Sequence, residues 1–148
     1  ESEIWRAWLA SRGDSLKVGL CWRSGMVDVM RQEFYVTPSM LLDGLGAKTS
    51  TYISLMYVDA GEEIASIRRT HGITIHEPPN INQRDELDRL AALISELDIV
   101  VTVDTSVCAM AAADRLSMLN EPIRLTLMTN LNFDRSIGTL LRSMVRPA

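Results

Sequence analysis

The sequence has little of what marks several common protein classes. Its 148 residues include two cysteines, which cannot make a disulfide framework. No apolar run approaches the roughly 20 residues of a membrane-spanning helix, so we expect no membrane span. No repeat or low-complexity segment interrupts the chain, and 47% hydrophobic residues are typical of a globular protein. These absences exclude disulfide-rich, membrane-spanning, collagen-like and disordered classes.

The sequence also lacks an excess of basic residues. It has 15 Lys and Arg against 19 Asp and Glu, which gives a net charge of −4. This balance offers no general attraction to nucleic acid or anionic membranes, and we expect neither as a partner. The length suits one domain, residues 1–148. The chain begins with Glu1, which we interpret as a sign of processing or of a longer parent. Cys21 and Cys108 are expected to be buried free thiols, as in a cytoplasmic protein.

Hydrophobic patterning predicts strands that alternate with helices. The apolar run at 99–103 is β-branched almost throughout, which is typical of a parallel strand buried on both faces. Thr37 and Pro38 mark the start of a helix, as N-cap and first helical residue. We expect strands at 16–22, 51–56, 73–76, 99–103 and 123–128, and helices at 1–12, from 37 to 44 or 46, 62–70, 85–97, 105–113 and 136–144. The 85–97 helix should bury Leu87, Leu90, Ala91, Ile94 and Leu97 on one face.

The fold class that follows is α/β, a Rossmann-like doubly wound parallel sheet. It should have about five strands in the order 3-2-1-4-5, within three α/β/α layers. Such sheets bind ligands beyond the carboxyl ends of their strands, where the strand order reverses. Here that point lies between the first and fourth strands. The loop 26–36 shows no clear period, and its role is left open.

Two short segments should face each other at this reversal point. Arg23-Ser24-Gly25 follows the first strand, and Asp104-Thr105-Ser106 follows the fourth. An arginine can clamp a phosphate, a glycine lets the backbone approach closely, and a helix start with hydroxyls suits an anion. The segments therefore predict an anionic, hydroxyl-rich ligand. The alternative is that the second segment only caps a helix.

Several other patterns are weaker. Residues 44–49, Gly-Leu-Gly-Ala-Lys-Thr, follow a helix and lack the glycine before lysine that a phosphate loop needs. Gly-x-Gly-x-x-Gly and Gly-x-Ser-x-Gly are both absent, which disfavours a nicotinamide enzyme and a serine hydrolase. His71 and His76 should end a helix and a strand. The acidic residues at 85, 86 and 88 should be a solvated first helical turn, so no metal site is expected.

The motifs resemble a known family. Residues 17–25, Lys-Val-Gly-Leu-Cys-Trp-Arg-Ser-Gly, resemble the "IGLxWxSG" opening of the C-terminal half-domain of bacterial glycosyltransferases with tetratricopeptide repeats. Residues 52–57 are similar to the family strand "FVSLQxG". The most specific match is 87–105, which is similar to "xDTAALIAALDLVISVDT" and to the sugar-nucleotide-binding half of the heptosyltransferases. The resemblance covers about residues 16–113 in the same order.

This resemblance implies the donor-binding half of a two-domain GT-B glycosyltransferase. Its substrate would be a nucleotide sugar, with no metal or other cofactor. Arg23, Ser24 and Gly25 would line the donor phosphates, while Asp104, Thr105 and Ser106 would meet the sugar or diphosphate. The turn at Met56 and Tyr57 would lie near the nucleobase. The acceptor and the catalytic base would belong to an N-terminal half-domain, and tetratricopeptide repeats are a further expected partner.

The sequence also departs from the family pattern. Ala109 stands at the family histidine, Ala112 at a glycine and Met56 at the glutamine of "SLQ". The aromatic "WYPS" segment has no counterpart. An imidazole that can bond a phosphate is therefore missing. These changes keep a second hypothesis open, a catalytically degenerate module with a structural or protein-interaction role. A third is a small-molecule-binding domain of a regulator.

Overall fold

The apolar runs of the sequence form a parallel sheet. The computed structural model describes residues 1–23, 36–45, 50–103, 106–107, 109–110 and 125–128. Its strands are β1 (Lys17–Cys21), β2 (Thr51–Ser54), β3 (Ile75–His76), β4 (Ile99–Thr102) and β5 (Leu125–Met128). Their order is β3-β2-β1-β4-β5, and every neighbouring pair is parallel. The predicted α/β class and the order 3-2-1-4 are therefore confirmed, and β5 joins through backbone pairing with β4.

Within the described residues, four helices with defined bounds accompany these strands, and local signals explain two of their ends. They are α1 (Ser2–Ala10), α2 (Pro38–Leu45), α3 (Gly61–His71) and α4 (Leu87–Ser95). Thr37 caps α2 as predicted, because its Oγ1 accepts a hydrogen bond from the Met40 amide at 3.2 Å. Gly72 ends α3 in the left-handed region at φ 65°, where a side chain would be strained.

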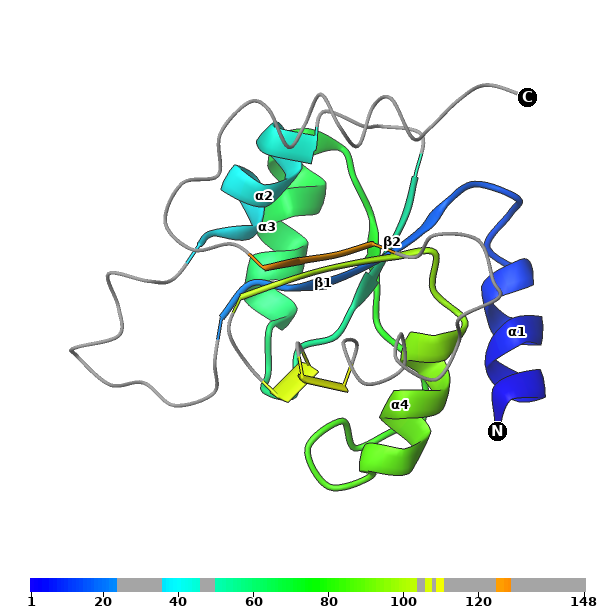
Figure 1. Ribbon diagram of the computed structural model, residues 1–148. Coiled ribbons are helices and arrows are strands. Elements are labelled where there is room, and N and C mark those ends of the chain that lie inside the picture. Colours follow the sequence, from blue (N-terminus) through cyan, green and yellow to red (C-terminus); the bar gives the residue numbers. More distant parts are fainter. Residues whose placement is uncertain (24–35, 46–49, 104–105, 108, 111–124, 129–148) are drawn as a thin grey trace.

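The chain path explains why the helices form two pairs. From β1 to β3 the chain steps across the sheet in one direction through α2 and α3, and α4 then returns it to β4 beside β1. Right-handed crossovers in opposite directions place helices on opposite faces. In agreement, α2 packs against α3 and α1 packs against α4, with the strands running between the two pairs (Figure 1).

The centre of the sheet is closed to solvent on both faces. Every residue of β1, β2 and β4 is buried, as the continuous apolar runs predicted. Lys17, at the start of β1, is the charged residue of these strands, with 8% of its surface exposed. Its ammonium group donates to the backbone carbonyls of Gly13 and Ser15, so the buried charge is compensated.

Helix α4 differs from the prediction at its start and on its face. Asp85 and Glu86 lie in a turn before the helix, because Glu86 has the non-helical angles φ −99° and ψ 62°. Leu87, expected in the core, is 51% exposed. The buried stripe is Leu90, Leu93, Ile94 and Leu97. Leu90, Ile94 and Leu97 are thus buried as predicted, whereas Leu93 takes the place of Ala91, which is exposed. Leu87 is the first residue of α4, a full turn before Leu90.

Several predicted elements fall outside the described residues. These are the loop through residue 35, most of the 105–113 helix, and the 136–144 helix. Residues 106–107 and 109–110 are helical, as expected. Within the described part of the chain, no helix has the length and apolar character to cross a bilayer.

Candidate functional site

The reversal point of the strand order brings the ends of β1 and β4 together. Cys21 pairs with Thr102, and the Val103 amide donates to the Cys21 carbonyl at 3.0 Å. Trp22 and Val103, the residues that follow these two strands, therefore lie at the same edge of the sheet. Ser106 lies here, exposed, where the chain becomes helical. Ser24, Gly25, Asp104 and Thr105 lie outside the described residues, so their predicted roles stay predictions.

Arg23 is the predicted site residue with the most developed contacts. Its Nη2 donates to a Glu63 carboxylate oxygen at 2.6 Å, and its Nε lies 3.1 and 3.2 Å from the two oxygens. The same Nη2 donates to the carbonyl of Asp59 at 2.9 Å. The guanidinium is thus fixed over the start of α3, at the carboxyl end of the sheet.

Glu63 is a residue that the sequence analysis missed. It also accepts a hydrogen bond at 3.0 Å from the indole N–H of Trp22, which is fully buried. Burial raises the pKa of Glu63, but the hydrogen bonds from Arg23 and Trp22 outweigh that effect and leave the pKa below its usual value. A signal was present in the sequence. Because α3 follows β2, its first turn must lie at the same edge of the sheet as the segment after β1.

The Arg23–Glu63 pair changes what this edge can do chemically. An anion arriving at Arg23 meets a cation that already has a carboxylate partner. The net charge of the pair is near zero, so the attraction for a phosphate is weaker than for an unpaired arginine. In return the guanidinium is held in one orientation, which lowers the entropy cost of binding a ligand to it.

The two residues predicted near a nucleobase lie at the carboxyl end of β2. Met56 is 5% exposed, and its amide lies 3.4 Å from the hydroxyl of Ser54. Tyr57 is half-buried beside it. Since Leu20 of β1 pairs with Ser54, this turn lies one strand away from the Arg23 site.

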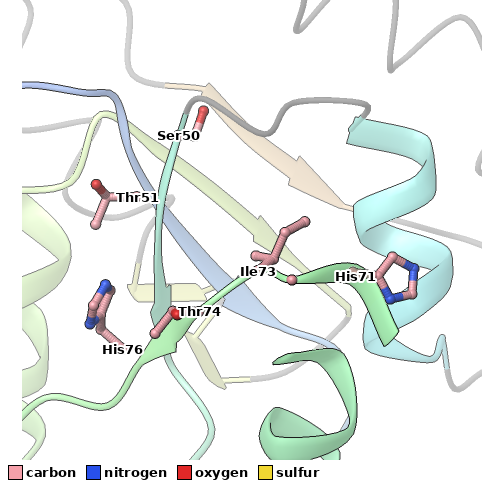
Figure 2. A pocket seen from close by; sticks show the side chains of 7 residues that line it. Ser50, Thr51, His71, Ile73, Thr74 and His76 are labelled. Carbon is pink, nitrogen blue, oxygen red and sulfur yellow. The ribbon is translucent and has the colours of Figure 1, made fainter. Parts of the chain in front are cut away.

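A hollow of about 210 Å³ lies at the opposite edge of the sheet. It is lined by Ser50, Thr51, His71, Gly72, Ile73, Thr74 and His76. In Figure 2, His76 lies beside Thr51 and Thr74, whereas His71 lies apart from them beside α2. His71 Nε2 lies 3.2 Å from Asp43 Oδ1. As predicted, His71 is the last residue of α3 and His76 is the last residue of β3. No group of metal-binding side chains occurs among the described residues.

The Arg23–Glu63 contact predicts an acid-dependent loss of stability. The folded pKa of Glu63 lies below its usual 4.5, so its stabilising effect is complete above that pH. The effect is lost as the pH falls through the folded pKa. The difference in unfolding free energy between wild type and Glu63→Gln should therefore be larger at pH 6 than at pH 3. Urea unfolding at both pH values measures it, and a difference that stays constant contradicts the prediction.

Comparison with known proteins identifies one distant relative. Over 109 residues, 74% of this chain, the sequence is 29% identical to "Protein FlbA" of Caulobacter vibrioides. The matched part is 18% of that relative's length, so the chain spans less than a fifth of it. No family model matches the chain. No solved structure matches it either.

Proposed function

We propose that this chain is the nucleotide-sugar-binding half of a GT-B glycosyltransferase, with a Rossmann-like, three-layer architecture. The observation that carries the proposal is the adjacency of β1 and β4 at the reversal of the strand order, with Arg23 fixed at that edge. This is the position at which sheets of this type bind phosphorylated ligands. The motif resemblance around residues 17–25, 52–57 and 87–105 supplies the ligand class.

Each part of the site has a distinct role in this proposal. Arg23 contacts the donor diphosphate and stabilises the charge that develops on the leaving phosphate during transfer. Ser106, with Asp104 and Thr105, holds the sugar or diphosphate from the β4 side. Met56 and Tyr57 flank the nucleobase. The acceptor nucleophile is activated by groups of the second half-domain, so the 148 residues alone bind the donor without completing transfer.

A binding experiment tests this proposal. Calorimetric titration of the intact protein with UDP-, GDP- and ADP-sugars should show saturable binding to at least one of them. Arg23→Met should weaken that binding about 10- to 100-fold, the size expected for losing a hydrogen bond to a charged group. Arg69→Met is the matched control, because Arg69 is exposed on α3. No binding to any donor, or equal affinities in wild type and Arg23→Met, would contradict the proposal.

A degenerate structural or interaction module is the second candidate. Two observations favour it. Glu63 already neutralises Arg23, and Ala109, which is exposed at the start of the helix after β4, offers no imidazole for a phosphate. The titration separates the candidates, since this one predicts that no nucleotide sugar binds at any accessible concentration.

A further inference from the structure

One buried polar atom at the carboxyl edge, Gln83 Oε1, has no hydrogen-bond partner in the described part of the chain. Gln83 lies in the turn between β3 and α4, and its side-chain N–H donates to the Ser54 carbonyl at 3.2 Å. The other end of the same amide, Oε1, is buried. It has no hydrogen-bond partner among the residues that the structure describes. A buried acceptor left in this state costs about 1–3 kcal/mol, so its retention requires an explanation.

The donating half of the amide has a structural role. Strand β3 is two residues long and pairs with Tyr52 and Ile53 of β2. Ser54, the next residue of β2, lies beyond the end of β3, so its carbonyl has no strand partner on that side. Gln83 supplies the missing donor. This role accounts for the N–H of Gln83 but leaves Oε1 unexplained.

The turn that carries Gln83 is firmly held. Arg89 donates to the Asn80 carbonyl at 2.7 Å, and the Asn82 amide donates to the Glu86 carboxylate at 2.6 Å. The side chain of Asn82 accepts from the Arg84 amide at 3.1 Å. These contacts lie on the outer side of the turn and hold the Gln83 backbone in position. The acceptor without a described partner therefore belongs to a segment held in place by its own hydrogen bonds, and a buried group of this kind calls for an explanation.

The position of Oε1 limits which ligand group can reach it. An amide carbonyl accepts hydrogen bonds and repels a phosphate oxygen, so the diphosphate is excluded as its partner. The hydroxyl of Ser54, which Gln83 contacts, also accepts from the Met56 amide at 3.4 Å, and the half-buried aromatic ring of Tyr57 belongs to the same turn. A flat heteroaromatic ring with N–H groups on its edge matches this combination.

We propose that the Gln83 side-chain carbonyl accepts a hydrogen bond from a nucleobase N–H at the carboxyl end of β2. The inference rests on the proposed nucleotide-binding function and assigns base recognition to a residue outside the family motifs. The amide then acts in two directions, with its N–H on the Ser54 carbonyl and its Oε1 on the base. Because Oε1 is closed to solvent, the side chains that cover it have to move aside when the base enters.

The test compares ligands that differ only in the base. The intact protein is titrated with UDP, ADP, GDP and CDP, and with ribose 5-diphosphate as the probe without a base. Gln83→Met, close in shape, should bind the preferred nucleoside diphosphate about tenfold more weakly, which equals about 1.4 kcal/mol. Its affinity for ribose 5-diphosphate should stay at the wild-type value. Arg84→Met, one residue further along and exposed, is the control and should change neither affinity.

Each remaining outcome has a defined meaning. Equal losses for all ligands, or no loss for any, overturn the inference and leave Gln83 with its structural role on Ser54. Wild-type protein that binds ribose 5-diphosphate as tightly as every nucleotide also overturns it, while the phosphate site of the proposed function survives. Wild-type protein that binds none of the five ligands overturns both. Urea unfolding of Gln83→Met identifies a variant that has lost its fold, and Gln83→Leu then takes its place in the same comparison.

Discussion

Replacing Trp5 with alanine is expected to lower the free energy of unfolding by about 3–5 kcal/mol, the range for truncating a buried aromatic side chain. Trp5 is 1% exposed and joins α1 to α4. Its indole N–H donates to the Arg89 carbonyl at 3.1 Å, and the Arg89 guanidinium lies 5.7 Å from its ring. Trp8 packs edge-on against it, at 6.1 Å between centroids and 82° between planes. Alanine removes all of these contacts and leaves a cavity.

Two further variants test the source of this loss in stability, one by keeping an aromatic ring at position 5 and one as a control on the same helix. Trp5→Phe keeps most of the apolar surface but removes the N–H, so it should cost about 1 kcal/mol for the lost hydrogen bond, plus a smaller packing term. Ile4→Ala is the control on the same helix, because Ile4 is 58% exposed and should change stability by less than about 0.5 kcal/mol. Urea unfolding followed by tryptophan fluorescence and circular dichroism measures all three. A loss below about 1 kcal/mol for Trp5→Ala would show that α1 contributes little to the stability of the sheet.

Gly19→Ala should destabilise the protein by about 1–3 kcal/mol, through overpacking rather than through a cavity. Gly19 lies in the middle of β1, between Ile53 of β2 and Val100 of β4. A Cβ atom placed there would lie 2.6 Å from Leu55 Cδ1 and 2.7 Å from Leu97 Cδ1. Both leucines are at most 1% exposed, so neither can move aside without disturbing its own neighbours.

Replacing a second glycine, Gly61, with alanine provides the control. At Gly61, the first residue of α3, a new Cβ would meet only Asp59 Oδ1, at 3.4 Å. Alanine also favours the helix by up to about 1 kcal/mol over glycine. Gly61→Ala should therefore be neutral or slightly stabilising, opposite in sign to Gly19→Ala. If the two variants unfold at the same urea concentration, the leucines beside Gly19 are less tightly packed than the structure shows.

The sequence could place a site residue only where that residue directly follows a strand whose position in the sheet is predicted. Arg23 was expected at the reversal point because the segment after the first strand must lie there in any sheet of this order. Its partner was not expected, since Glu63 is 40 residues away and belongs to another crossover. Gln83 was missed for the same reason. It reaches Ser54 across 29 residues, and nothing in its local pattern separates it from an ordinary turn residue.

By itself, the sequence determined the order of the elements, the parallel sheet and the start of a helix at Thr37. Those features depend on short-range causes: buried β-branched runs and a side-chain cap. Only the tertiary structure decided that α4 buries Leu93 and leaves Leu87 exposed, and that Glu63 is the carboxylate that holds Arg23. These depend on the register and angle at which crossovers return to the sheet. Contacts between distant elements settle that geometry together, so no local stretch of sequence contains it.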